Sequence, residues 1–329
     1  MPFKKIHGMN PALILFSLAL VISTLFSPDK LNSLNELSKY MNNLLLFIVI
    51  ASFTAGDKIR VIRAVVLAGL IISVLAIYQY FFGFRHLLSY IAKDRNTSAF
   101  TLDYIMRKRV FFPFVTPNIL GGYLAMIIPL SLLRKNKLWY ILPLLAALLL
   151  TKSLSALLSI FLALMVYYYL SGRLKKEGVF FLLGLAVIIG LIFAARSIAQ
   201  KQHLQPAFSA MMRLNYWRET LRIIKTAPLT GIGLGNFNLP ESRYAHNSYL
   251  QIWAETGIIG IASFLWIIFA LWKKALKKIK NSPDKNQSAC LIAASVALCA
   301  HNLFDFSFYL PEASLLWWAI GGLILAENA

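Results

Sequence analysis

The sequence contains few charged residues, and acidic ones are the scarcest. Charged side chains make up 14% of its 329 residues, with 13 Asp and Glu against 33 Lys and Arg, while 59% of the residues are hydrophobic. Soluble domains contain about a quarter charged and about half apolar residues. A soluble chain of this length could not bury so much apolar surface, whereas a lipid bilayer accepts it. The composition therefore predicts a single polytopic membrane domain over residues 1–329.

Cysteine is nearly absent, and the basic excess is dispersed. Only Cys290 and Cys299 occur, in one apolar run and without metal-ligand spacing, so we expect two small core residues. The formal net charge of +20 is divided among short segments between apolar runs. Cytoplasmic loops of membrane proteins carry such an excess. We therefore expect the bilayer, and no nucleic acid, as a partner.

Ten apolar runs are long enough to cross roughly 30 Å of hydrocarbon. They lie at residues 11–27, 41–56, 61–83, 118–133, 138–151, 153–171, 178–195, 249–272, 288–308 and 313–327. The predicted fold is therefore all-α, a transmembrane helix bundle of about ten spans. The first run follows Lys4 and Lys5 like a signal peptide, but no small-residue cleavage site ends it, which favours an uncleaved first helix.

The positions of the basic residues predict an orientation. With a cytoplasmic N-terminus, the cytoplasmic connections are rich in Lys and Arg, whereas the short outer loops contain only Lys30, Lys39 and Lys152. This alternation follows the positive-inside rule, so we expect both termini in the cytoplasm. Two long segments, 84–117 and 196–248, then lie outside, and long loops of this kind usually carry function.

An amphipathic helix is predicted over residues 211–225, within the second long outer segment. Apolar residues recur there at helical spacing: Leu214, Trp217, Leu221 and Ile224. Arg213 and Arg218 flank this apolar face. One interpretation is an interfacial helix whose cations reach lipid headgroups. The other is a clamp for an anion, because guanidinium groups fit phosphate oxygens.

A Gly-x-Gly-x-Gly string follows at Gly231, Gly233 and Gly235. Such strings bind nucleotides only on the strand-to-helix turn of a βαβ unit, and no such unit is predicted here. We interpret the string as a tight extracytoplasmic turn with close backbone packing. Gly257 and Gly260, further along, are predicted to let another helix approach closely.

Polar residues stand out at the start of the eighth run and in the ninth run. His246 can exchange a proton near neutral pH, so it is either a base for an acceptor hydroxyl or a packed polar residue. Asn247 follows it, and Glu255 lies about 13 Å further along a helix. A carboxylate at that depth needs a partner or a wet cavity and is a functional candidate. His301 and Asp305 are expected on one helical face, either as a structural pair or as a proton relay.

Three cations end the first long segment. Arg107, Lys108 and Arg109 precede an aromatic run that leads into the fourth predicted span. Their guanidinium and ammonium groups suit phosphate oxygens. They either hold one lipid phosphate or contact bulk headgroups.

Several motifs together carry a family resemblance. His246-Asn247 is followed, after nine residues, by Gly257-x-x-Gly260. The preceding stretches 213–217 and 228–237, the entry to the fourth span and the segment 301–322 fit the same pattern. Over roughly residues 105–325 the chain resembles the O-antigen ligase and O-antigen polymerase superfamily of bacterial membrane glycosyltransferases.

The resemblance implies transfer of a glycan from an undecaprenyl-diphosphate carrier to a glycan or glycolipid acceptor. It places the reaction outside the cytoplasmic (inner) membrane, without a metal, a nucleotide sugar or another cofactor. By the resemblance, Arg213 binds the diphosphate, whose developing negative charge fixed arginines stabilise. His246 serves as a catalytic base or orients the acceptor. Further candidates for substrate binding are Arg109, Arg218, Lys152, Asn247 and Glu255.

One position departs from the family pattern. Many relatives carry Thr-x-Ser-Arg where this chain has Thr151-Lys152-Ser153-Leu154. Lys152 is the candidate replacement for the missing arginine, although an ammonium group lacks the guanidinium fork.

The sequence does not separate a ligase from a polymerase. The alternative class is a transporter or flippase for lipid-linked or small polar substrates, which favours paired halves and polar groups near the midplane.

Overall fold

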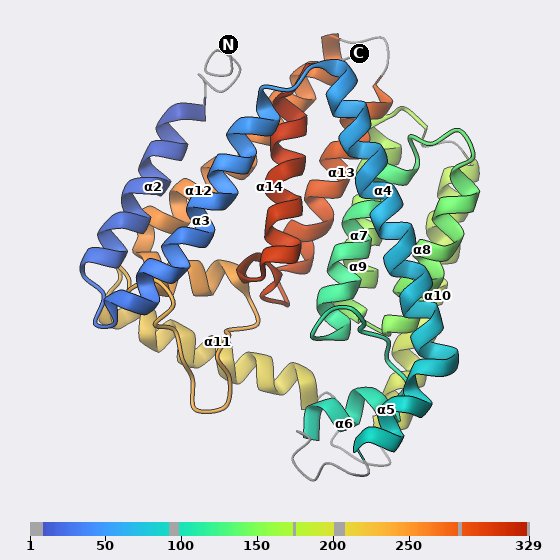
Figure 1. Ribbon diagram of the computed structural model, residues 1–329, viewed down its shortest axis with the longest axis horizontal. Coiled ribbons are helices and arrows are strands. Elements are labelled where there is room, and N and C mark those ends of the chain that lie inside the picture. Colours follow the sequence, from blue (N-terminus) through green and yellow to red (C-terminus); the bar gives the residue numbers. More distant parts are fainter. Residues whose placement is uncertain (1–8, 92–98, 174–175, 201–207, 282–284, 328–329) are drawn as a thin grey trace. The chain divides into compact units, whose positions relative to one another are not determined.

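The computed structural model describes residues 9–91, 99–173, 176–200, 208–281 and 285–327, and the regular elements in these ranges are all helices (Figure 1). Ten helices coincide with the predicted apolar runs: α2 (Asn10–Leu25), α3 (Lys30–Ala51), α4 (Ala55–Tyr78), α7 (Pro117–Ser131), α8 (Lys137–Thr151), α9 (Leu154–Leu170), α10 (Lys176–Gln200), α12 (Ser248–Asn281), α13 (Asn286–His301) and α14 (Pro311–Leu325). The remaining elements are η2 (Gln79–Gly83), α5 (Phe84–Ile91), α6 (Ala99–Met106), α11 (Phe208–Thr226) and η3 (Ser307–Tyr309). The predicted all-α class is confirmed for the described residues.

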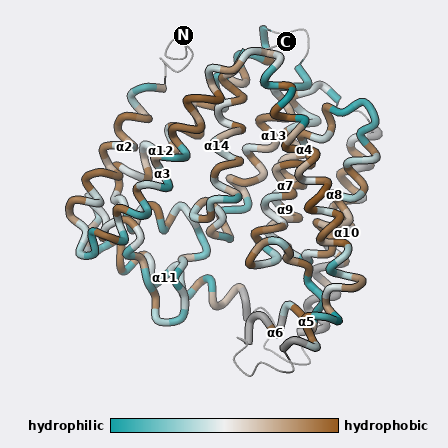
Figure 2. The backbone as a smooth tube through the Cα atoms, viewed as in Figure 1, coloured by the Kyte–Doolittle hydropathy of each residue, from teal (hydrophilic) through white to brown (hydrophobic). Residues whose placement is uncertain are grey.

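The apolar helices indicate a membrane location. Two helical stretches, Ala55–Ser89 and Ser248–Asn281, are long and apolar enough to cross a bilayer, and six further apolar helices are shorter. On α4, Leu67, Ile71 and Val74 are each more than half exposed and follow helical spacing, so they form an outward apolar stripe. Figure 2 shows hydrophobic colour along these helices and hydrophilic colour at many of their connections. The ten spans, the cytoplasmic termini and the two outer segments stay predictions.

The second predicted run is part of a longer helix. α3 begins at Lys30, before the apolar run starts, because the Asp29 carboxylate accepts a hydrogen bond from the Asn32 N–H at 3.0 Å. A side-chain cap of this kind satisfies an amide at the start of a helix. The first half of α3, which follows the α2–α3 turn, is therefore rich in polar side chains.

The ninth predicted run is shorter than expected. α13 ends at His301, and the Asn302 side chain turns to other partners: its Oδ1 accepts hydrogen bonds from Ser248 Oγ (2.6 Å) and from the Phe308 N–H (3.0 Å). Asp305 consequently lies in the turn that precedes η3. The prediction that His301 and Asp305 share one helical face is wrong, because the helix does not reach Asp305.

The chain forms two compact units, of which the first comprises the described residues of 1–58, 195–288 and 302–329. Within it α2 packs against α12 and α3 packs against α14. Aromatic rings fill the space between these helices: Phe16, Phe264, Trp317 and Trp318. The α2–α3 turn, η3 and the segment 227–247 lie at one end of this unit, opposite the end of α14 (Figure 1).

The second unit comprises the described residues of 59–194 and 289–301. In it α7 packs against α8 and α9, and Gly121 permits this approach, since a β-carbon there would lie 2.7 Å from Ala156 Cβ. The first long segment contains the short helices α5 and α6. The Gln79 side chain fixes the chain after them by accepting hydrogen bonds from the N–H groups of Phe111 (2.8 Å) and Phe112 (3.0 Å).

Candidate functional site

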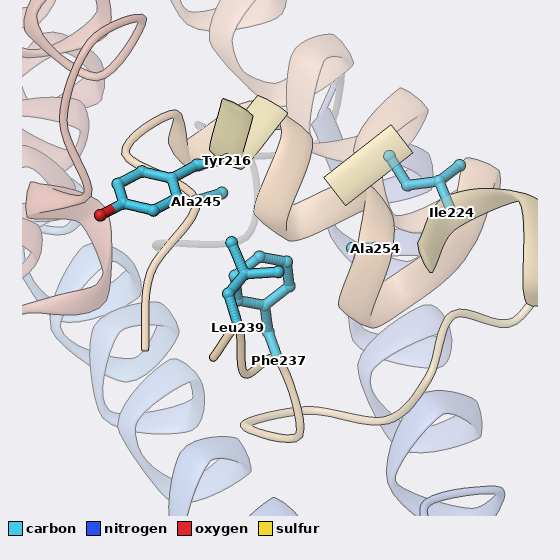
Figure 3. Packing of buried hydrophobic residues seen from close by; sticks show 6 residues of the cluster. All are labelled: Tyr216, Ile224, Phe237, Leu239, Ala245 and Ala254. Atoms are coloured by element: carbon cyan, nitrogen blue, oxygen red, sulfur yellow. The ribbon is translucent and has the colours of Figure 1, made fainter. Parts of the chain in front are cut away.

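The predicted helix over 211–225 is present as α11, but its buried face matches the predicted apolar face only in part. Its buried residues are Tyr216, Thr220 and Ile224, of which Ile224 was predicted. Leu214 and Leu221, predicted to be part of the apolar face, are 56% and 44% exposed. The packing partners come from the following segment (Figure 3): Phe237, Leu239, Ala245 and Ala254. Because these partners lie outside the helix, its own periodicity could not identify the buried face.

Arg213 lies on α11 beside the turn that precedes η3. Its Nε donates a hydrogen bond to the backbone oxygen of Phe304 at 3.0 Å. One turn further, the Trp217 ring lies 6.1 Å from the ring of Phe304. These contacts hold the start of α11 on this turn, where the guanidinium charge lowers the pKa of His246.

His246 lies between two aromatic side chains. Its ring stacks on Tyr216 at a centroid distance of 5.6 Å, and Phe306 meets it edge-on at 5.0 Å. The residue has a left-handed backbone with φ of 51°, which is uncommon outside glycine. Its Nδ1 is buried and has no hydrogen-bond partner among the described residues.

The surroundings of His246 keep its ring neutral. Burial lowers the pKa of His246 from 6.5 to about 4; the Asp305 carboxylate opposes this shift, and the Arg213 guanidinium adds to it. A neutral imidazole can accept a proton at physiological pH. The structure thus brings together the two residues predicted to be catalytic, a cation and a proton acceptor.

Asn247 caps α12. Its Oδ1 accepts hydrogen bonds from the N–H groups of Tyr249 (3.0 Å) and Leu250 (3.1 Å). The N–H of Ser248, which precedes these two, donates to the backbone oxygens of Asn302 and Asp305. Asparagine is among the preferred residues at this position, so the side chain has a structural role in addition to the predicted contact with substrate.

The glycine string packs against a break in α12. Gly257 has φ of 70° and ψ of −174°, which interrupts the helix. The N–H groups of Ile232 and Gly233 donate to the backbone oxygens of Ala254 (2.9 Å) and Glu255 (3.2 Å). These oxygens belong to the turn at which the helix is interrupted, where carbonyls need new partners. The prediction of a tight turn with close backbone packing is confirmed.

A loop approaches the first of the two glycines of α12. A β-carbon on Gly257 would overlap the backbone oxygen of Leu229, and one on Gly260 would overlap the side chain of Thr256. The nearest atoms to Gly257 thus belong to a loop and those to Gly260 to its own helix, so the close approach of another helix at these glycines stays a prediction. At this break the 228–233 turn packs against the first part of α12. That part of the helix lies between His246 and the break and contains Glu255.

Glu255 is buried within the first unit and is only 1% exposed. Its Oε1 accepts a hydrogen bond from Gln251 Nε2 at 3.1 Å, while Oε2 has no partner among the described residues. Its backbone oxygen accepts a hydrogen bond from Ser23 Oγ at 2.6 Å. The carboxylate is thus held in place and retains one unused acceptor.

Arg218 is placed apart from His246. It is exposed on α11, and its Nη1 donates to Asn215 Oδ1 at 3.4 Å. The charged groups that act on the His246 ring are Asp305 and Arg213. The structure therefore groups Arg213, and not Arg218, with the imidazole.

Arg109 and Lys152 lie together in the second unit. Arg109 is 8% exposed and donates from Nε to the Thr151 oxygen and from Nη2 to Asn118 Oδ1, both at 3.0 Å. Lys152 Nζ donates to the backbone oxygen of Arg107 at 2.7 Å. Burial lowers the pKa of Lys152, and the nearby charges of Arg109, Lys108 and Arg107 lower it further. Positive charge is concentrated around this turn.

Sequence reasoning missed several residues of the first unit. Tyr216 and Phe306 enclose the imidazole, and Glu36 and Tyr309 line a pocket with Glu255. Their partners are far away in the chain, so no local pattern marks them. Among the described residues, no three His, Cys, Asp or Glu side chains are grouped as metal ligands would be.

Comparisons with known proteins agree with the sequence motifs. A family model described as O-antigen ligase matches residues 139–265, a range that includes Lys152, Arg213, His246 and Glu255. Two curated proteins, from Rickettsia conorii and Rickettsia felis, are named for a proposed polysaccharide ligase activity. Each is 26% identical over 179 or 180 residues, which is 47% of this chain. The chain spans less than half the length of these relatives, 41% and 42%.

Proposed function

Because the family match and the two relatives support an O-antigen ligase-like family for this chain, we propose that it is a membrane glycosyltransferase. The proposed donor is a glycan on undecaprenyl diphosphate, and the proposed acceptor is a glycan or glycolipid at the outer face of the cytoplasmic membrane. The observation that carries the proposal is that α11 places Arg213 on the turn before η3 and Tyr216 on the His246 ring, so that a cation and a neutral imidazole belong to one site.

The reaction requires a base and a cation close together. The acceptor oxygen attacks the anomeric carbon of the donor, and the bond from that carbon to the diphosphate oxygen breaks. His246 takes the proton from the acceptor hydroxyl. The diphosphate leaves with the bonding electron pair, and Arg213 stabilises its negative charge through charge-assisted hydrogen bonds.

The low pKa of His246 fits this sequence of events. Before the donor binds, burial and Arg213 keep the ring neutral. A bound diphosphate brings negative charge to the same place, and a nearby negative charge favours the protonated imidazole. The base thus becomes stronger when the donor is bound, which is when a proton must be accepted.

The remaining cations receive different proposed roles. Arg109 holds the turn at Thr151 and Asn118, and so positions Lys152, which we propose contacts a donor phosphate in place of the arginine absent at Leu154. Arg218 is exposed on α11, which suits contact with lipid headgroups. Both assignments follow from the chemistry of phosphate binding by Lys and Arg.

A polymerase of the same superfamily would use the same donor site and differ only in its acceptor. The alternative of a transporter or flippase needs no base, and the neutral His246 beside Arg213 favours transfer over transport. Of these functions, only transfer breaks the bond between the glycan and the carrier diphosphate, so release of the carrier separates them.

The direct test is a transfer assay with purified protein in lipid nanodiscs. The probe is undecaprenyl diphosphate that carries a radiolabelled glycan, offered with a glycolipid acceptor or with excess donor glycan. We expect release of undecaprenyl diphosphate and label in the acceptor for a ligase, or in longer chains for a polymerase. Movement of intact donor between leaflets with no released carrier would contradict the proposal.

A further inference from the structure

A pocket opens in the first unit, which also contains the candidate catalytic pair. It has a volume of about 120 Å³ and lies between α3, η3 and α14. The side chains that matter for its chemistry are Glu36, Lys39, Tyr40, Asn43, Phe308 and Tyr309. A smaller adjoining pocket shares Glu36 and Tyr309 and extends to Gln251 and Glu255.

The Glu255 carboxylate supplies an unused acceptor to the smaller pocket. The residue is 1% exposed, and its Oε2 has no hydrogen-bond partner among the described residues. The Tyr309 hydroxyl and the Gly235 N–H approach the carboxylate, but neither completes a hydrogen bond to Oε2. A buried carboxylate oxygen without a donor is costly, so the site suits a ligand that brings donors.

The charges around the pocket are balanced. Glu36 forms an ion pair with Lys39 at 2.6 Å, and Arg243 lines the smaller pocket with Glu255. The linings of the two pockets together thus contain two carboxylates and two cations. A ligand with a full positive charge gains no net attraction from such a lining, whereas neutral hydroxyl groups can donate to a carboxylate and accept from Tyr or Asn.

Aromatic contacts connect this pocket with His246. Tyr244, which lines the smaller pocket, stacks on Phe306 with ring centroids 4.0 Å apart, and its ring lies 6.3 Å from that of Tyr309. Phe306 in turn meets His246 at 5.0 Å. One stacked aromatic pair therefore separates the pocket from the imidazole, so a ring held in the pocket anchors the acceptor near the proposed base without itself contacting it.

We propose that the two pockets together bind a sugar of the acceptor, a neutral ring whose hydroxyl groups donate to Glu255 and accept from Tyr309. Few, convergent polar groups beside aromatic surface are typical of small-ligand sites. The assignment of this sugar as the acceptor rests on the proposed glycosyl transfer, whereas its binding can be measured without any reaction.

The test is saturation-transfer-difference NMR on the full chain in nanodiscs. The probes are D-glucose, D-galactose and N-acetyl-D-glucosamine, with D-glucosamine as the charged comparison. We expect at least one neutral sugar to bind, and we expect Glu255→Gln and Tyr309→Phe each to weaken that binding by about tenfold or more. Tyr309→Phe removes a single oxygen and guards against a folding defect in the first variant.

The matched control is Glu219→Gln, which removes an exposed carboxylate paired with Arg222 and should leave sugar binding unchanged. His246→Ala should also retain binding, so a failure of the transfer reaction would be distinguishable from a failure of this pocket.

In the transfer assay, Glu255→Gln should raise KM for the acceptor and not for the donor; the reverse pattern would assign the pocket to the donor. Neutral sugars that bind equally to wild type and both pocket variants, or that bind to none, would overturn the inference, as would preferential binding of D-glucosamine.

Discussion

Gly231 and Gly257 occupy matching positions on two backbone segments that touch. A β-carbon on Gly231 would overlap the backbone oxygen of Glu255, and one on Gly257 would overlap that of Leu229. Both residues have positive φ, 74° and 70°. The two glycine motifs of the sequence thus have one physical cause, since the turn and the helix break must approach without side chains.

Replacing Gly257 should disturb the fold and the site together. We expect Gly257→Ala to lower the free energy of unfolding by at least about 2 kcal/mol, because alanine is strained at this φ and ψ and collides with the facing turn. Thermal unfolding in detergent measures the change. The control is Gly184→Ala on α10, where nothing lies within 4 Å of the new β-carbon; equal melting temperatures for the two variants would contradict the account.

The pH dependence of transfer should reflect the lowered pKa of His246. The free enzyme holds this pKa at about 4, so kcat/KM should fall on the acid side only well below pH 6.5. Arg213 lowers the pKa, so its removal in Arg213→Met should raise the pKa and move this fall to higher pH. The profile of residual activity is the measurement. A fall that stays in place, or moves to lower pH, would show that Arg213 does not act on the base.

Asn247 should behave mainly as a helix cap. Asn247→Ala loses two hydrogen bonds to backbone N–H groups and should cost about 1 kcal/mol of stability. Asn247→Ser, which also caps helices, should recover most of the loss. Thermal unfolding and the KM for donor and acceptor are measured on both variants. A normal melting temperature with a raised KM would favour direct contact with substrate instead.

Arg109 and Lys152 should differ in what their removal changes. Arg109→Lys loses the fork that joins Thr151 and Asn118 and should cost about 1–3 kcal/mol of stability. Lys152→Gln should leave the melting temperature nearly unchanged and raise the KM for the lipid-diphosphate donor.

The exposed Lys135 provides the control for charge removal. Lys135→Gln should change neither stability nor KM. If Lys152→Gln and Lys135→Gln had the same donor KM, Lys152 would have no part in phosphate binding.

The regular helices of this chain could be predicted from sequence because their signals are local. Apolar runs, together with caps such as Asp29 and Thr116, are contained within short windows, and each predicted run overlaps a helix. The end of α13 could not be predicted, because it depends on hydrogen bonds between Asn302 and Ser248, residues far apart in the chain.

The candidate site was only partly predictable for the same reason. His246 and Arg213 could be identified from a motif and a helical pattern. The buried face of α11 could not, since Tyr216 is selected by partners such as Ala245 that follow the helix. The pocket was also missed, because Glu36 and Tyr309 meet only after α3 and η3 have packed in the first unit.

The central claim is that Arg213 and His246 act as one unit in glycosyl transfer, and a double-mutant cycle tests it most directly. Single-turnover transfer rates are measured for Arg213→Ala, His246→Ala and the double variant, each in nanodiscs and each shown to be folded. We expect each single variant to be slower by about 10²-fold or more, and the double variant to be little slower than the worse of the two. Near-normal rates in either single variant, or independent losses that multiply in the double variant, would contradict the claim.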